Sequence, residues 1–556
     1  MTPAALWKGF SDETADAEIV VLKDETAGGI HTRAFYFSAL KSGNAAVRCF
    51  VTIRRPAGHT ALPAAIILCP EDRRASYEKV VLSQKCAAVY VDYEGAMPGK
   101  ERFTIYPPAF GYAEMSEYAG AGKDFNALFK IKKSATETPW YVWTAIVRRA
   151  IAVIKNHENT DRNRIGLIGV RSGANIGWKI IGSTKLVCAA ALIEAAGRED
   201  HGIVYSETDT RYKQGASDEN YMLSLSTAAY IPNVTCPVLV HSGTNGANNM
   251  FDRTSFNMER LPVSAPLLFS VSPRGDKELD YKQAQNLKKW VAGFVGGGLE
   301  FPPQPQTSAE IKDGKLEIRV RAGLPGKIKG VTVYYSYATT APARRNWYGI
   351  PAAETDDGAF SAKADIYYPG KHIYYFAVAD YKDGFAQASF ADNIIPEITV
   401  PPAQPQRVLY DARVNGFDCF TAETGERIHT QKQPLSLQKC PGGIVGITAP
   451  KGNIVTYKAG DLRFLPPSPD AGLVFTLYSE KDRTVKIKLT EYSGGEKGRQ
   501  YSGCFKLLGA EGWQKIVCAC NDFKTALNVP LTSWSNIVKM SIKTDGGVLV
   551  SNIIWV

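Results

Sequence analysis

The chain has 556 residues, of which 45% are hydrophobic, 11% aromatic and 22% charged. These are ordinary values for a folded protein and exclude extensive disorder; at roughly 150 residues per domain, the length predicts three or four domains. Sixty-five Lys and Arg residues against 55 Asp and Glu give a net charge of +10. Because the basic residues form only short, scattered clusters, no nucleic-acid-binding surface is expected.

Neither a membrane span nor a cofactor is expected. No apolar run approaches roughly 20 residues, the length needed to cross a bilayer as a helix. The first ten residues lack the basic start and apolar stretch of a signal peptide, so none is expected in this chain. Ten cysteines are too few for a disulfide scaffold, and no His/Cys cluster has metal-ligand spacing, so no metal is expected.

Two proline-rich stretches divide the chain. They lie at 301–305 (Phe-Pro-Pro-Gln-Pro) and 400–405 (Val-Pro-Pro-Ala-Gln-Pro), and such stretches are typical of linkers. The predicted domains are therefore 1–300, 303–400 and 405–556.

The first segment alternates predicted strands and helices. Apolar and β-branched runs predict strands at 46–54, 63–69, 86–93, 164–169, 186–194, 236–241 and 266–271. Apolar residues at helical spacing predict helices at 139–156, from 173 through 180, and at 279–294. This alternation predicts an α/β fold with a doubly wound, mostly parallel sheet.

The two later segments are predicted to be β-sandwiches. Alternating strands at 315–321, 330–337, 359–367 and 372–380 predict an immunoglobulin or fibronectin III-like sandwich for the second segment. Many short strands predict a jelly-roll for the third. Its aromatic residues Trp513, Phe523, Trp534 and Trp555 resemble the closing half of sandwiches found in carbohydrate-binding modules. These side chains could either pack in the core of the domain or form a sugar-binding platform.

A glycine-flanked motif follows the predicted strand at 164–169. It reads Gly169-Val170-Arg171-Ser172-Gly173. Together with the run 91–95 (Val-Asp-Tyr-Glu-Gly) and the strand at 236–240, it resembles the α/β-hydrolase family, in particular acetyl xylan esterases and dienelactone hydrolase-like esterases. The resemblance covers about the first 300 residues. It implies an α/β-hydrolase sheet with a nucleophile elbow at this turn.

The resemblance also implies a Ser–Asp–His triad, and all three positions are substituted. The nucleophile position holds Arg171, the acid position holds Gly246, and the histidine position corresponds to Lys277. A guanidinium stays protonated at physiological pH and cannot attack a carbonyl carbon. The sequence therefore predicts a degenerate triad with no intact catalytic residue and no ordinary acyl-enzyme.

Other residues could take over a catalytic role. Ser172 would serve as nucleophile only if the turn slipped by one residue, and His201 could face the pocket as a base. His241 is expected to be structural, and Asp252 could be a displaced acid.

The pocket of the first domain is expected to gather residues from several loops: Tyr93, Glu94, Arg171, Ser172 and Lys277. Because Arg171 would stand at a helix N-terminus, where the dipole is already positive, it needs a partner. Glu94, Glu194, Asp276 or a bound anion, such as a carboxylated ligand, could supply the negative charge.

Three functional interpretations follow. The first is an inactive esterase homologue that acts as a binding or assembly protein, with a carbohydrate, an anionic ligand or a protein as partner. The second is an active carbohydrate esterase with a relocated catalytic group. The third is a structural or surface-assembly protein. The family resemblance favours a location outside the cytoplasm.

Overall fold

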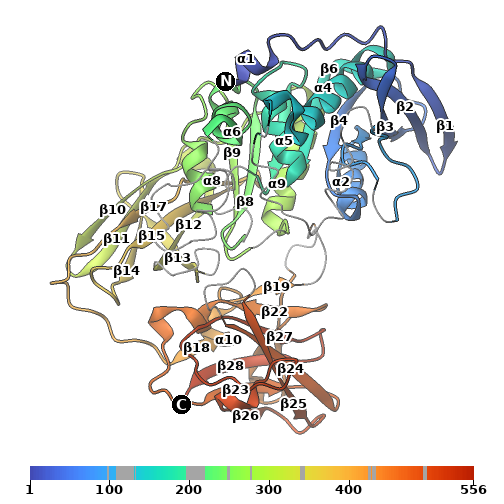
Figure 1. Ribbon diagram of the computed structural model, residues 1–556. Helices are drawn as coiled ribbons and strands as arrows, with labels where there is room; N and C mark the ends of the chain where they lie inside the picture. Colours follow the sequence, from blue (N-terminus) through green and yellow to red (C-terminus); the bar gives the residue numbers. More distant parts are fainter. Residues whose placement is uncertain are drawn as a thin grey trace.

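The computed structural model describes residues 1–96, 99–107, 131, 133–195, 219–246, 251–275, 278–337, 345–423, 428, 434–491 and 498–556. Figure 1 shows three parts: an α/β part, a β part beside it, and a second β part at the C-terminus. Among the described residues, no helix combines the length and apolar character needed to cross a membrane.

The first part is built on a nine-stranded mixed sheet in the order β1-β2-β3-β5-β4-β6-β7-β8-β9. Its strands are β1 Val20–Ala27, β2 Ile30–Ser42, β3 Ala45–Pro56, β4 Leu62–Leu68, β5 Ala87–Val91, β6 Thr160–Val170, β7 Ala189–Ile193, β8 Val238–Gly243 and β9 Leu267–Ser272. From β5 to β9 all neighbours are parallel, and β1, β2 and β3 pair antiparallel at one edge. The α/β class and mostly parallel sheet are confirmed. The antiparallel hairpin β1–β2 was missed because β1 is exposed along its whole length and gives no alternating pattern, although β2 contributes Phe35 and Phe37 to the core.

Helices cover both faces of this sheet. They are α1 Pro3–Trp7, α2 Glu71–Ser83, α4 Pro139–His157, α5 Ser172–Ile181, α6 Glu219–Ser224, α7 Thr227–Tyr230, α8 Phe251–Met258 and α9 Tyr281–Gly296. Apolar residues of α4 and α5 pack with one face, whereas those of α2 and α9 pack with the other. The strand order, the two helical layers and the turn after β6 are those of an α/β-hydrolase-like fold.

The second part is an antiparallel sheet of eight strands. They are β10 Gln306–Lys312, β11 Lys315–Arg321, β12 Ile328–Tyr337, β13 Tyr348–Glu354, β14 Phe360–Asp365, β15 Ile373–Tyr381, β16 Ala386–Ala388 and β17 Asp392–Ile394. The sheet encloses its own apolar core. An all-β segment is confirmed, and its assignment to the immunoglobulin or fibronectin III class stays a prediction.

The second part is fused to the edge strand β9 of the first. The amide of Gln387 accepts a hydrogen bond from the Phe269 backbone N–H and donates one to the Leu267 carbonyl, both at 2.8 Å. Trp347 and Phe376 belong to the core of the first part. Side-chain amides thus satisfy backbone groups that an edge strand would otherwise expose.

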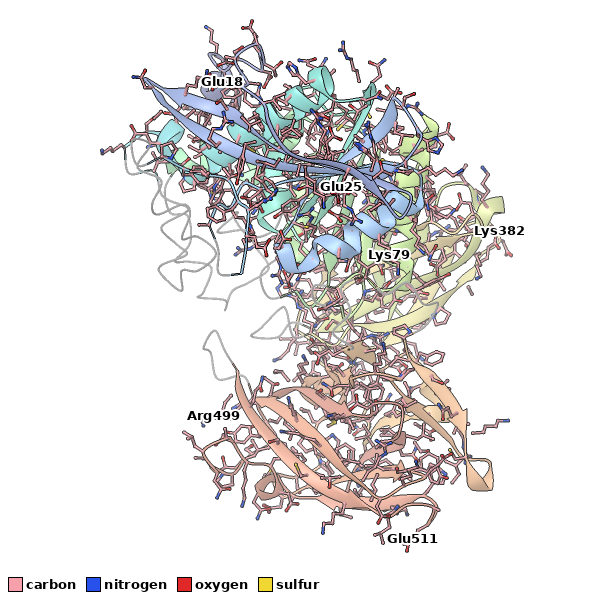
Figure 2. All side chains as sticks on the ribbon, turned by 90° about the vertical axis from the view of Figure 1, so that its right-hand side faces the viewer. Glu18, Glu25, Lys79, Lys382, Arg499 and Glu511 are labelled. Atoms are coloured by element: carbon pink, nitrogen blue, oxygen red, sulfur yellow. The ribbon has the colours of Figure 1, made fainter. Side chains whose placement is uncertain are left out.

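The third part contains two facing sheets, with orders β20-β21-β28-β23-β26, to which β18 adds, and β19-β22-β27-β24-β25. Its elements are β18 Val408–Asp411, α10 Ala412–Asn415, β19 Thr421–Glu423, β20 Ser436–Lys439, β21 Val445–Thr448, β22 Asn453–Thr456, β23 Leu473–Tyr478, β24 Arg483–Glu491, β25 Arg499–Leu507, β26 Gln514–Cys518, β27 Ile537–Lys543 and β28 Leu549–Trp555. Arg499 and Glu511 mark this part in Figure 2, where Lys382 marks the second. The jelly-roll class stays a prediction.

Most of the aromatic residues considered for sugar binding lie inside this sandwich. Phe523, Trp534 and Trp555 are buried in the core between the sheets. Trp513 is only partly buried and packs on Tyr478, with ring centroids 5.5 Å apart. Core packing therefore explains three of the four side chains.

Candidate functional site

The turn after β6 carries the strain expected of an elbow. Arg171, the residue between β6 and α5, has φ 56° and ψ −117°, a conformation that non-glycine residues rarely adopt. Its backbone N–H donates to the carbonyl of Ile193 at 2.9 Å. The strained position is thus Arg171, and Ser172 already belongs to the first turn of α5. The turn has not slipped by one residue to present Ser172.

Close packing explains the two glycines of the motif. A Cβ on Gly169 would lie 2.6 Å from Cα of Ala174, and one on Gly173 would lie 2.1 Å from the carbonyl oxygen of Leu68. These are backbone contacts that no side-chain rotation relieves. The turn therefore has the tight packing of an elbow, with Arg171 at its strained position.

Glu194 is the carboxylate that pairs with Arg171. Arg171 Nε donates to Glu194 Oε2 at 2.9 Å, and Nη1 of Arg73 lies 3.6 Å from Glu194 Oε1. Arg73 and Glu194 are buried, with 2% and 8% of their side chains exposed, whereas Arg171 is 39% exposed. One buried carboxylate therefore lies between two guanidinium groups, and burial strengthens that attraction. Arg73 was not foreseen, because its place next to Glu194 depends on the packing of α2.

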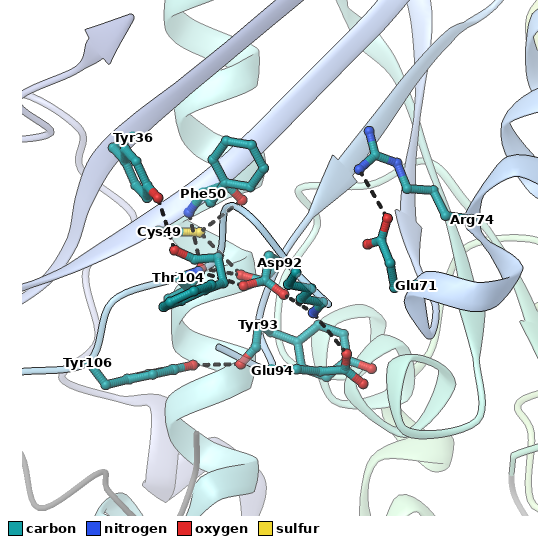
Figure 3. A network of polar contacts seen from close by, with 12 residues as sticks. Tyr36, Cys49, Phe50, Glu71, Arg74, Asp92, Tyr93, Glu94, Thr104 and Tyr106 are labelled. Carbon is teal, nitrogen blue, oxygen red and sulfur yellow. Dashed lines mark hydrogen bonds and ion pairs between the residues drawn. The ribbon is translucent and has the colours of Figure 1, made fainter. Parts of the chain in front are cut away.

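Glu94 belongs to a different ion-pair network, drawn in Figure 3. Lys100 Nζ lies 2.8 Å from Asp92 Oδ1 and 3.2 Å from Glu94 Oε2. Burial raises the pKa of Glu94. Burial also opposes the charge of Lys100, but the two carboxylates hold the pKa of Lys100 above its ordinary value. Asp92 further accepts from the Thr104 backbone N–H at 2.6 Å. This network fixes the loop after β5.

Tyr93 is buried, with 1% exposed. Its ring packs on Trp143, with centroids 5.9 Å apart, and its carbonyl accepts from the hydroxyl of Tyr106 at 2.6 Å. Through these contacts Tyr93 packs in the core of the first part.

The loop that contains the acid position is tied to the second part of the chain. Gly246 is buried two residues beyond Thr244, at the end of β8. The side chain of Asn245 donates to the carbonyl of Arg345 at 2.8 Å, and Thr244 Oγ1 accepts from the backbone N–H of Arg274 at 2.6 Å. Asn245 thus ties this loop to the second part, whereas Thr244 ties it to the loop after β9.

Asp252, considered as a displaced acid, also binds the second part. Nη1 of Arg345 lies 2.8 and 2.7 Å from its two carboxylate oxygens, and both side chains are buried. The guanidinium of Arg345 also lies over the ring of Tyr374 at 3.8 Å from its centroid. The carboxylate is therefore already engaged in an interdomain ion pair.

His241 lies on the buried strand β8. It is completely buried, and Nε2 lies 3.0 Å from Oγ of Ser272. Burial lowers the pKa of His241 to about 3, so the imidazole is neutral at physiological pH. This agrees with the expectation of a structural role.

Three other expected residues, Lys277, His201 and Asp276, lie outside the described residues. Their roles remain predictions. Within the described part of the chain, no cluster of three or more His, Cys, Asp or Glu side chains could hold a metal.

A large cavity lies where the three parts meet. It has a volume of about 1160 Å³ and is lined by residues of all three. Its half-buried aromatic side chains are Tyr281, Tyr334, Phe385 and Phe417. Ion pairs hold its wall: Lys282–Asp380 at 2.6 Å, Arg274–Asp418 at 3.2 Å, and Lys539–Glu423.

Charge in this cavity is balanced. The described lining contains five basic and five acidic side chains. Although burial opposes it, Asp380 holds the pKa of Lys282 above its ordinary value. Arg171 does not belong to this lining, so the cavity and the elbow are separate sites. No sequence motif predicts this cavity, because its walls come from segments up to 268 positions apart (Val271 to Lys539).

No protein-family model matches the chain, and no curated protein matches it. Among solved structures, acetyl xylan esterase 1 from Thermoanaerobacterium sp. JW/SL YS485 is similar over 52% of this chain and 93% of its own, with 11% identity and a TM-score of 0.39. An acetyl xylan esterase from Paenibacillus sp. R4 is similar over 53% and 92%, with 12% identity and a TM-score of 0.38. A glucuronoyl esterase from Solibacter usitatus is similar over 52% and 91%, with 13% identity and a TM-score of 0.36. At these values the likenesses say nothing about the activity of this chain.

Proposed function

We propose that the chain is a non-catalytic esterase homologue that binds carbohydrate. One observation carries the loss of catalysis: the strained residue of the elbow is Arg171, and its guanidinium is paired with Glu194. A nucleophile must carry a free electron pair at the reacting atom, and a guanidinium does not have one at physiological pH.

Two other candidate catalytic residues support the same conclusion. His241 is buried and neutral, and its Nε2 faces Ser272 rather than the elbow residue. Asp252 is paired with Arg345. Because Glu194 holds the guanidinium of Arg171 in an ion pair, we place ligand binding elsewhere.

The cavity between the three parts is the better candidate for carbohydrate. Aromatic faces can pack on the apolar faces of sugar rings, while fixed carboxylates, ammonium groups and guanidinium groups can bind hydroxyls. Ligand sites commonly lie at domain junctions. The balance of charges favours a hydroxyl-rich ligand over a small ion at this place.

Hydrolysis can be tested with a small acetyl ester and a serine-reactive fluorophosphonate probe. We expect neither turnover above background nor labelling of the wild-type chain. Arg171→Ser should also remain inactive, because the acid and base are not restored. An active acetyl xylan esterase assayed in parallel is the positive control. Labelling of the wild type that Ser172→Ala abolishes would overturn the proposal and favour an active enzyme with a relocated nucleophile.

Binding can be tested on a glycan array with single cavity variants. Tyr281→Ala and Phe417→Ala should each weaken glycan binding at least about tenfold, as for a buried aromatic contact. Trp513→Ala is the matched control, because this partly exposed aromatic lies outside the cavity. Loss of binding in the control alone would move the site to the third part. No glycan binding, together with large ordered assemblies in sedimentation, would favour a structural role.

A further inference from the structure

The outer face of the sheet β19-β22-β27-β24-β25 gathers lysines. Lys486 and Lys488 project from β24, and Lys543 from β27, and all three are exposed. With Asn453 and Ser541 they line a hollow of about 310 Å³. We call these five residues the lysine face.

The strand register brings like charges together. Ile487 pairs with Ile542, so Lys486 and Lys543 come from adjacent positions on neighbouring strands. Like charges directly opposed on a sheet destabilise it. Within the described part of the chain, Lys543 has a weak, exposed partner in Asp545 at 3.3 Å, and no carboxylate lies within ion-pair distance of Lys486 or Lys488. The repulsion between these lysines lowers the stability of the sheet, and a bound anionic ligand would relieve it.

The rest of this face favours a carbohydrate over a nucleic acid. The neighbouring outward positions on β25 hold Ser502, Cys504 and Lys506, and no aromatic side chain occupies an outward position of β24, β25 or β27 among the described residues. Proteins that bind single-stranded nucleic acid usually stack bases on aromatic rings. The hydroxyl of Ser541 and the amide of Asn453, which lie between the lysines, suit hydroxyl groups instead.

The lysine face continues into the large cavity. Lys539, Ser541 and Lys543 alternate along β27, so their side chains share one side of the sheet. Lys539 lines the large cavity, whereas Ser541 and Lys543 line the hollow. The four-residue interval spans about 13 Å, which is longer than one sugar ring. Figure 1 shows β19 and β22, in the same sheet, on the side of the third part that faces the other two.

From this geometry we infer that the lysine face binds an acidic polysaccharide, whose carboxylate or sulfate groups pair with Lys486, Lys488 and Lys543 as the chain leaves the cavity. This deepens the proposed carbohydrate-binding role, yet it does not depend on the aromatic contacts inside the cavity. Binding should weaken as salt rises, because small ions compete for the lysines.

The test is affinity electrophoresis of the full chain in gels that contain polygalacturonate, a sulfated glycan such as dextran sulfate, or neutral dextran. Wild-type protein should be retarded by at least one acidic polymer and not by dextran. The triple variant Lys486→Gln, Lys488→Gln, Lys543→Gln should bind about tenfold or more weakly, with a shallower dependence on salt. Retardation by polygalacturonate alone identifies carboxylates as the ligand groups, and retardation by dextran sulfate alone identifies sulfates.

A matched control removes the same number of charges elsewhere in the third part. Lys439→Gln, Lys481→Gln, Lys515→Gln changes three exposed lysines outside the hollow. An equal loss in this control would show a nonspecific effect of net charge and overturn the inference. No retardation by either acidic polymer at low salt, or duplex DNA competing as strongly as the polysaccharide, would also overturn it. Tyr281→Ala separates the two proposals. If binding survives Tyr281→Ala but not the triple variant, the lysine face is supported and the cavity is excluded as a glycan-binding site.

Discussion

The elbow and the lysine face both gather positive charge, and they do so in opposite ways. At the elbow, Arg73 and Arg171 share the buried carboxylate of Glu194. On the lysine face, Lys486 and Lys488 are exposed, with no such carboxylate among the described residues. The difference follows from water: a buried cation needs a fixed counter-charge, whereas an exposed one is solvated and stays available to a ligand. The comparison teaches that a cation held by a buried carboxylate serves the structure, whereas a cluster of solvated cations stays available to a ligand.

The strongest way to break this comparison is to remove the shared carboxylate. Glu194→Ala should lower the free energy of unfolding by about 3–5 kcal/mol, because the buried guanidinium of Arg73 would lose its counter-charge. Urea denaturation at pH 7 measures this loss.

Arg171→Ser is the matched control for that change. Arg171 is 39% exposed, so its pair with Glu194 is screened by solvent, and Glu194 keeps Arg73. We expect a loss of at most about 1 kcal/mol. If Arg171→Ser destabilised the chain as much as Glu194→Ala, the elbow pair and not Arg73 would be the main contribution, and our account of the site would be wrong.

A pH series sharpens the contrast between a buried and a solvated group. His241 has a pKa of about 3 in the folded chain, against 6.5 as the ordinary value. Below pH 6.5 the unfolded chain therefore binds a proton that the folded chain does not, and stability falls as the pH decreases toward 3. Between pH 7 and pH 5 this group should cost about 2 kcal/mol of unfolding free energy.

His241→Gln provides the comparison, because glutamine is polar and does not titrate. Between pH 7 and pH 5 the unfolding free energy of the variant should fall less steeply with decreasing pH than that of the wild type. This difference in slope does not depend on the absolute stability of the variant. Parallel slopes for the two proteins would show that folding does not lower the pKa of His241, and would contradict the buried, neutral imidazole.

Much of the elbow could be predicted from sequence because its constraints are local. Gly169 and Gly173 signal a tight turn between a strand and a helix, and the required carboxylate was narrowed to a few candidates that included Glu194. The alternating apolar segments likewise predicted the parallel strands β4 to β9. A short motif and a regular spacing of apolar residues can both be recognised in a single sequence.

The remaining features depend on contacts between distant segments. Arg73 reaches Glu194 only through the packing of α2, and Asp252 meets Arg345 across 93 positions. The exposed strand β1 lacks the clear alternation that a buried face imposes. The third part gave a partial signal: its lysines are visible in the sequence, but only the register of β24 against β27 shows that they share one surface.

The smallest expected effect concerns the stability of the lysine face itself. Lys486→Gln should leave the unfolding free energy unchanged or raise it by about 0.2–0.5 kcal/mol, because it removes repulsion between neighbouring lysines at low salt. The gain should disappear as salt screens the charges. Chemical denaturation at low and high salt measures it, with Lys515→Gln as the control. A clear loss of stability in Lys486→Gln alone would mean that this lysine has a structural partner. The lysine face would then resemble the elbow, where the charges are paired, and the contrast between the two would fail.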